Sequence, residues 1–191
     1  MILITLQYVP VNFTAAFLAL KEDEIKLFHY QMAFFTHVYT SIFVLIFGAF
    51  QFSTWLRQKF SGLHKGMGYA YISLILVFAS PSGLVMGYYG NGGIYSKISF
   101  CLLAILWFCF TLLALLKIKQ KKYLAHRSFM ILSYALTLSA ISLRLFKWLI
   151  VHTLELPPMD TYKIVVWLGW VFNLGISIII IKYTGHTSKQ R

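Results

Sequence analysis

Two histidines occupy equivalent places in the chain, each directly before a basic residue at the start of a long apolar run. His64 precedes Lys65, and His126 precedes Arg127. Neutral imidazole is a ligand of haem iron, and haem ligands in helix bundles come from side chains on facing helices. The pattern therefore favours a b-type haem with His64 and His126 as iron ligands, and with Lys65 and Arg127 neutralising its propionates. The alternative is that both histidines lie in the polar interface of a membrane.

A second group of polar residues lies deeper within the apolar runs. His37, Arg144 and Asn173 fall inside three different runs, and Ser80 to Gly83 interrupts another. Such groups are costly in lipid, about 2.5–3.5 kcal/mol for an arginine at mid-span, and they normally face the interior of a bundle. We expect His37, Arg144 and the interruption to converge on one pocket, where Arg144 would meet an anionic or carbonyl group. Alternatively, Arg144 reaches outward to a lipid phosphate.

The elements that must position these residues follow from the composition. The 191 residues are 59% hydrophobic and 12% charged, with a mean hydropathy of +0.74. A soluble domain of this length could not cover so much apolar surface, and lipid-exposed spans must be helices because they satisfy their own backbone groups. We predict an all-α, polytopic transmembrane helical bundle that forms one membrane domain over residues 1–191. Five spans are expected at residues 32–53, 67–88, 98–116, 128–151 and 163–182.

The two ends of the chain are less regular than the spans. Residues 1–20 are apolar, but Gln7, Pro10 and Asn12 interrupt them, and acidic residues follow. This segment forms either a sixth, weak span or an extracytoplasmic segment on the bundle, so that residues 1–30 would lie mostly outside. Residues 183–191 are expected to form a cytoplasmic tail.

The net charge of +12 indicates topology rather than nucleic-acid binding. Eleven of the seventeen basic residues fall on one side of the membrane if the spans alternate. Because positively charged loops stay in the cytoplasm, this side and the C-terminus are expected to be cytoplasmic. The expected partners are the lipid bilayer and a quinone or a membrane protein, and no nucleic acid. The eleven residues are Arg57, Lys59, Lys65, Lys117, Lys119, Lys121, Lys122, Arg127, Lys182, Lys189 and Arg191.

No motif in the sequence indicates a hydrolase or a nucleotide-binding protein. A P-loop, a dinucleotide fingerprint, a metalloprotease helix and a nucleophile elbow are all missing from it. The only two cysteines, Cys101 and Cys109, are two helical turns apart within one span and too distant for a disulfide. Whether the chain is an enzyme stays open at this stage.

A set of residues spread along the chain carries a resemblance to a known family. The set is His37, Gly48, Gln51-Phe52, Arg57, Leu63-His64-Lys65-x-x-Gly68-x-x-Tyr71, Trp107, His126-Arg127-x-x-Met130, Arg144 and Trp170-x-x-Asn173. Together they resemble a bacterial integral membrane family catalogued as domain of unknown function 2306, over nearly the whole chain from about residue 8. The resemblance implies a multi-pass protein of the bacterial cytoplasmic (inner) membrane, and it implies no activity.

A looser resemblance concerns chemistry. The span from His37 to Gln51, followed by a basic loop and His64-x-x-x-Gly68, is similar to consecutive haem-ligating helices of transmembrane di-haem cytochromes b. That resemblance implies one haem on the cytoplasmic side, held by His64 and His126. The third span has no histidine, so His37 lacks a partner for a second haem. His37 with Arg144 would then suit a quinone.

Three functions are compatible with these patterns. The first is haem-dependent electron transfer with a quinone, using the sites proposed above. The second is a non-enzymatic accessory subunit or lipid-binding protein of a larger complex. The third is an anion carrier with Arg144 as counter-ion, which is the weakest because the chain has no inverted repeat or pair of broken helices.

Overall fold

The computed structural model describes residues 5–9, 11, 18–19 and 21–189, and the described part is helical without any strand. Five of its helices are long and apolar enough to cross a membrane, as the sequence predicts. Short helices η2 (Glu24–Lys26) and α3 (Thr54–Lys59) lie in the connections. The spans are α2 (Phe28–Gln51), the continuous helix α4 (Ser61–Ser73), η3 (Leu74–Ala79) and α5 (Ser80–Tyr88), then α6 (Gly93–Lys119), α7 (Tyr123–Leu154) and α8 (Pro158–Lys189).

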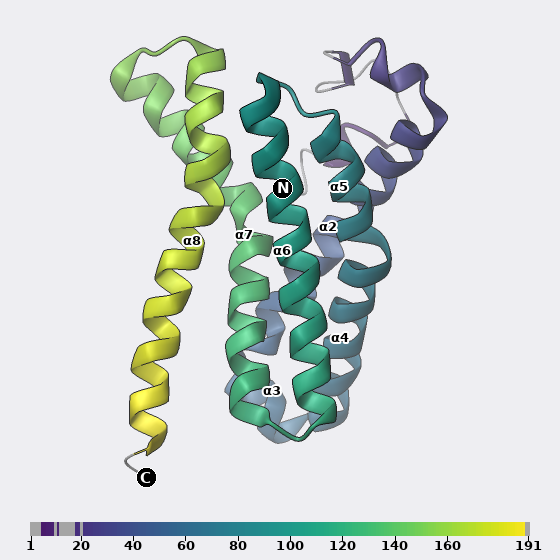
Figure 1. The fold of residues 1–191 in the computed structure, drawn as a ribbon. Helices are drawn as coiled ribbons and strands as arrows, with labels where there is room; N and C mark the ends of the chain where they lie inside the picture. The colour runs from purple at the N-terminus through teal and green to yellow at the C-terminus, as the bar shows by residue number, and fades with distance from the viewer. Residues whose placement is uncertain (1–4, 10, 12–17, 20, 190–191) are drawn as a thin grey trace.

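Consecutive spans run in opposite directions through the bundle. Helix α6 packs between α5 and α7, and α2 packs along α4 and α5 (Figure 1). Helix α8 packs on α7 and leans away from the other helices towards its C-terminal end (Figure 1). The prediction of five membrane-spanning helices is confirmed. Each of these helices begins before its predicted span, whereas α2 ends at Gln51, two residues short of the predicted end.

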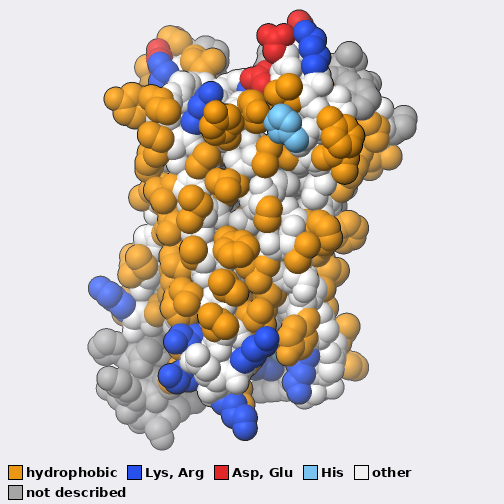
Figure 2. Space-filling model, turned by 45° about the vertical axis from the view of Figure 1, so that its right-hand side comes forward, with side chains coloured by type: hydrophobic (Ala, Val, Ile, Leu, Met, Phe, Trp, Pro, Cys, Tyr) orange, Lys and Arg blue, Asp and Glu red, His pale blue; other side chains and the backbone are white. Residues whose placement is uncertain are grey.

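The charges divide the bundle into two ends. The basic end holds α3, the turn between α6 and α7, and the C-terminal part of α8 (Figure 1). All five acidic residues of the chain lie before α2 or between the end of α7 and the first turn of α8, at the opposite end, which we term the acidic end. Figure 2 shows this polarity, with a wide apolar band between the two ends. Exposed apolar side chains such as Phe43, Val77 and Leu145 belong to the surface that faces lipid.

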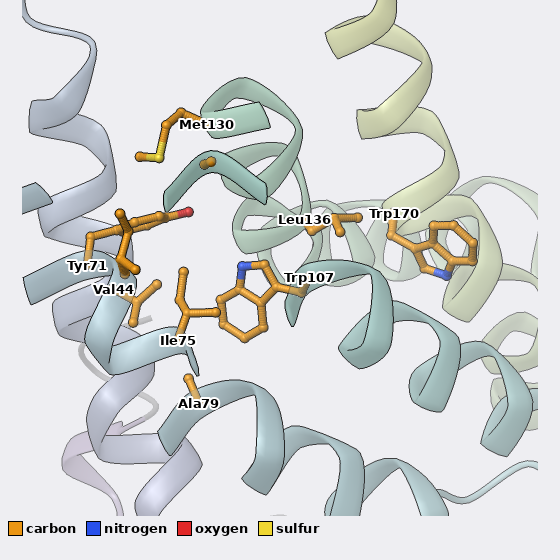
Figure 3. Packing of buried hydrophobic residues seen from close by; sticks show 10 residues of the cluster. Val44, Tyr71, Ile75, Ala79, Trp107, Met130, Leu136 and Trp170 are labelled. Atoms are coloured by element: carbon orange, nitrogen blue, oxygen red, sulfur yellow. The ribbon is translucent and has the colours of Figure 1, made fainter. Parts of the chain in front are cut away.

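The core of the bundle is apolar at its edges and hydrogen-bonded at its centre. Val44, Ile75 and Trp107 are buried around Tyr71, which is fully buried (Figure 3). The Tyr71 hydroxyl group is 2.9 Å from Ser133 Oγ and 3.0 Å from the Thr137 hydroxyl oxygen, both on α7. Buried polar groups remain inexpensive when they are paired in this way. The Tyr71 hydroxyl therefore ties α4 to α7 in the middle of the membrane.

The sequence suggested an interruption of the second span at Ser80 to Gly83, but the structure shows no break there. The helix continues through this stretch to Tyr88, and the irregularity is the π-helical segment η3 just before it. Pro81 has no backbone N–H, so the preceding turn cannot keep regular helical hydrogen bonding. A π-helical segment absorbs the defect, and such segments often occur at functional sites.

The expectation that residues 1–20 form a sixth span or a surface segment falls largely outside the described residues. Within the described part, Tyr8 and Leu18 are buried in a small cluster with Tyr30 and Phe34 of α2. Lys21 is also buried, and its Nζ donates hydrogen bonds to a carboxylate oxygen of Glu24 and to the carbonyl oxygen of Tyr89. The residues before α2 are thus attached to the acidic end of the bundle.

Candidate functional site

His64 and His126 come together at the basic end of the bundle. His64 lies in the first turn of α4 and His126 in the first turn of α7, and the two rings are close enough to interact electrostatically. His126 Nδ1 is 2.8 Å from the carbonyl oxygen of Ala114 on α6. A carbonyl oxygen can only accept, so Nδ1 carries the proton, and Nε2 of a neutral ring is left with a free lone pair.

The His64 ring differs from that of His126 in its hydrogen bonding. Its Nδ1 is buried and has no hydrogen-bond partner among the described residues. Leaving a buried polar atom unpaired costs about 1–3 kcal/mol, and each such case needs an explanation. The backbone at this position is tied to α2, because the Gln51 side-chain nitrogen donates to the His64 carbonyl oxygen at 3.5 Å. Gly68 permits this approach, since a Cβ there would lie 3.0 Å from the Gln51 side-chain oxygen.

The basic residues near the two histidines are arranged differently from the sequence expectation. Arg57, in the short helix α3, interacts electrostatically with His64, a pairing that the sequence did not indicate. Lys65 is exposed next to His64. Arg127 is exposed and lines a groove between α7 and α8, whereas His126 faces α6. Consecutive residues on a helix point in directions about 100° apart, which separates the two side chains.

A protein-only metal centre has no support among the described residues. No group of three or more His, Cys, Asp or Glu side chains could hold a metal ion there. A haem differs in this respect, because its macrocycle surrounds the iron and the protein supplies only the axial ligands. The described residues offer two imidazoles at this end of the bundle: the Nδ1 of His126 is anchored to a carbonyl oxygen, and the buried Nδ1 of His64 has no partner among them.

His37 lies towards the acidic end, against the irregular part of the second span. Its Nδ1 donates to the Ala79 carbonyl oxygen at 2.8 Å, and Ser82 Oγ lies 3.4 Å from the same nitrogen. A Cβ at Gly83 would lie 3.0 Å from the ring, so glycine is needed for this close approach. The ring also contacts Trp107 edge to face, with centroids 6.5 Å apart. The Nδ1 proton leaves Nε2 as the basic nitrogen.

Arg144 lies on α7 close enough to His37 and to Tyr8 for electrostatic interaction. Its guanidinium group donates to the Ala140 carbonyl oxygen of its own helix at 2.7 Å. None of the three ion pairs between described residues includes it. The structure thus packs His37 against the Ser80 to Gly83 segment, and Arg144 is an exposed residue within electrostatic range of that ring.

Asn173 lies apart from both histidine regions and has its own partners. Its side-chain oxygen accepts from Ser142 Oγ at 2.9 Å, and its side-chain nitrogen donates to the Ala135 carbonyl oxygen at 3.0 Å. Both partners are on α7, so the amide group fastens α8 to α7. The binding role expected for Asn173 stays a prediction, and its observed hydrogen bonds join two helices.

A buried polar cluster, which the sequence reasoning missed, joins three spans between the two histidine regions. The Trp107 indole N–H donates to the Thr137 hydroxyl oxygen at 3.1 Å, and the hydroxyl groups of Thr111 and Ser133 are 2.7 Å apart. The Tyr71 hydroxyl group bridges Ser133 and Thr137. The one available signal was the presence of Ser133 and Thr137 one turn apart on α7, facing the same side.

A helical bundle with five membrane spans, an apolar outer surface and histidine sites at two depths defines a multi-pass integral membrane protein. The profile of the family described as predicted membrane protein (DUF2306) matches residues 34–181. The chain belongs to this family, which confirms the resemblance seen in its sequence. Neither a curated protein nor a solved structure matches the chain.

Proposed function

We propose that the protein transfers electrons within the membrane, with one b-type haem held by His64 and His126 and with a quinone as electron partner. The single observation that carries the proposal is the buried, unpaired Nδ1 of His64 beside the ring of His126. The unpaired nitrogen on one helix is available to the iron, and the imidazole on the other helix has a fixed tautomer, so the two rings can serve as the axial ligands of a bis-histidine site. When bound, the haem supplies a one-electron redox couple.

The residues around the pair have separate tasks in this proposal. The hydrogen bond from His126 Nδ1 to the Ala114 carbonyl oxygen orients the ring and, in the neutral form, leaves the Nε2 lone pair for the iron. Arg57 and Lys65 provide positive charge for the propionates at the membrane surface. Gln51 and Gly68 hold the start of α4 against α2, which fixes the position of the His64 backbone.

The quinone would bind in the region of His37 and Arg144, towards the acidic end. Oxidation of a quinol to a quinone releases two electrons and two protons, so its site needs a base and a donor for the oxygen atoms. His37 Nε2 is free to accept a proton, since Nδ1 donates to the Ala79 carbonyl oxygen. The Arg144 guanidinium group carries donors for a carbonyl oxygen.

We further propose that the basic end faces the cytoplasm of a bacterial cell and that the acidic end faces outward. The support is the concentration of basic residues at one end of the bundle (Figure 2). Cysteine-accessibility labelling of a Gln120→Cys variant tests this orientation, because Gln120 is exposed in the turn between α6 and α7. A membrane-impermeant reagent is expected to label the introduced thiol in inverted vesicles and not in intact cells. Labelling in intact cells would reverse the assignment.

The test of the haem is a reduced-minus-oxidised absorption spectrum of protein purified from cells with ample haem. We expect a b-type signal that is lost in His64→Ala and in His126→Ala. His152→Ala is the matched control, because His152 lies exposed near the other end of α7. A colourless wild-type protein would overturn the proposal and favour an accessory or lipid-binding role.

A further inference from the structure

An open groove of about 340 Å³ runs between α7 and α8 towards the basic end of the bundle. Its walls include Ile131 and Leu138 of α7 and Ile176 and Ile180 of α8. The groove exists because Asn173 fastens the two helices together with hydrogen bonds and α8 then diverges towards its C-terminal end (Figure 1). No histidine lines this groove.

The groove has an apolar length and a charged mouth. Arg127, exposed at the basic end, contributes to its lining and takes part in none of the ion pairs between described residues. Along α7, Arg127 and Leu138 are three helical turns apart, or about 16 Å. Half the hydrocarbon thickness of a bilayer is about 15 Å. The groove therefore runs from the membrane surface to roughly the middle of the bilayer, the depth of one acyl chain.

Another, smaller groove has a lining without charge. It has a volume of about 260 Å³, lies between α5 and α6, and is lined by residues such as Pro81, Leu84 and Phe108. No charged residue lines it. Of these two grooves, only the one between α7 and α8 combines an apolar lining with a guanidinium group.

We propose that the α7–α8 groove binds a phospholipid with an anionic headgroup. The acyl chain lies between Ile176, Ile180 and Leu138, and the Arg127 guanidinium group binds the phosphate. Charge complementarity supports a net negative headgroup, because Lys121 and Lys122 precede α7 at the same end. Basic pockets between membrane helices recognise such headgroups in the same way. This site is independent of the proposed haem and quinone sites.

The headgroup is tested by native mass spectrometry of the protein released from nanodiscs. Two nanodisc lipids are compared, phosphatidylglycerol and phosphatidylcholine. We expect the wild-type protein to retain phosphatidylglycerol in preference to phosphatidylcholine, and Arg127→Gln to retain about fivefold less of it, the factor that one basic residue near an anionic surface contributes. Lys119→Gln is the matched control, because it removes the same charge at the same end from an exposed residue outside the groove.

The acyl chain is tested separately by filling the groove. Ile176→Trp places a bulky ring inside it, whereas Ile179→Trp places the same ring on α8 at a residue that does not line the groove. Loss of bound lipid in the first variant and retention in the second is expected. Equal lipid retention by Arg127→Gln, Ile176→Trp and wild type would overturn the proposal. A dimer that only Ile176→Trp dissociates would also overturn it, because a second copy of the chain would then occupy the groove.

Discussion

His64 at the basic end and His37 at the acidic end differ in the hydrogen bonding of their Nδ1 atoms. At the basic end, the Nδ1 atom of His64 is buried without a partner among the described residues. At the acidic end, the backbone of the second span is distorted next to His37, and the Ala79 carbonyl oxygen accepts from its Nδ1. The first arrangement leaves a deficit of hydrogen bonding that a bound group can remove. The second fixes one side of a ring and leaves the other side free for a ligand.

This difference in hydrogen bonding corresponds to the two kinds of binding site in the proposed function, one for a metal-ligating imidazole and one for a proton-accepting imidazole. A metal-ligating imidazole needs an available nitrogen and a fixed orientation, and the orientation of His126 is set by a carbonyl oxygen on α6. A proton-accepting imidazole needs a fixed tautomer and a nearby substrate, and the Gly83 backbone leaves room for the His37 ring. The ends should therefore respond differently to substitution, and each of the following experiments can break or sharpen that contrast.

The largest effect is expected from His37→Gln. This substitution removes the basic nitrogen while keeping a polar side chain, so the rate of quinol oxidation should fall by about a hundredfold, the lower end of general-base contributions. The haem spectrum should stay unchanged, because the proposed ligands His64 and His126 lie at the other end. Stopped-flow reduction of the oxidised protein by a short-chain quinol measures the rate. An unchanged rate with an intact spectrum would remove His37 from the quinone site.

Much of the architecture was predictable, because it depends on local properties of the sequence. Each span needs about 20 apolar residues, and the basic loops mark one side of the membrane, so both the five helices and the two polar ends followed. The approach of His64 to His126 also followed, because both begin spans that start from the same side. Alternation of the spans is enough to place them at equal depth.

The contacts that decide chemistry were not predictable in this way. The partner of His126 is a backbone carbonyl oxygen on α6, and any residue at position 114 would supply one. The position of Arg57 beside His64 depends on the path of the short helix α3. Arg127 faces a groove because of the rotation of α7, which its sequence does not show. Such features arise from the packing of whole helices.

The region between the two ends gives the next largest effect. Tyr71→Phe removes a fully buried hydroxyl group that bridges Ser133 and Thr137, leaving both without this partner. We expect a loss of about 1–3 kcal/mol in the free energy of unfolding. Tyr69→Phe serves as control, because Tyr69 is 58% exposed on the same helix. Equal stability of the two variants in denaturing detergent would show that the cluster adds nothing to the contact between α4 and α7.

A pair of glycine substitutions compares the two ends within one continuous helix. Gly83→Ala would push on the His37 ring, because a Cβ there lies 3.0 Å from Cε1, whereas a Cβ at Gly66 meets nothing within 4 Å. Gly83→Ala should lower the quinol oxidation rate by about tenfold, since small misplacements of a reacting group are costly. Gly66→Ala should leave both the rate and the haem spectrum as in wild type. If Gly66→Ala lowered the quinol oxidation rate and Gly83→Ala did not, the site of oxidation would lie near His64.

The smallest effect concerns the attachment of the residues before α2 to the acidic end. The hydrogen bond from Lys21 lowers the pKa of Glu24 below its ordinary value of 4.5. A depressed carboxyl pKa contributes stability that is fully present above the unfolded value and is lost as the pH falls through the lower, folded value. The thermal midpoint of the wild-type protein should therefore decrease below about pH 4.5 more than that of Glu24→Gln.

The control for that measurement is the neighbouring pair of Asp23 and Lys26, whose side chains are 93% and 73% exposed. An exposed pair of this kind contributes little, so Asp23→Asn should keep the wild-type dependence on pH. Lys21 differs because its ammonium group is buried and also bonds to the Tyr89 carbonyl oxygen at the end of α5. If Glu24→Gln and Asp23→Asn behaved alike, the attachment would depend on the apolar contacts of Tyr8 and Leu18 with α2 alone.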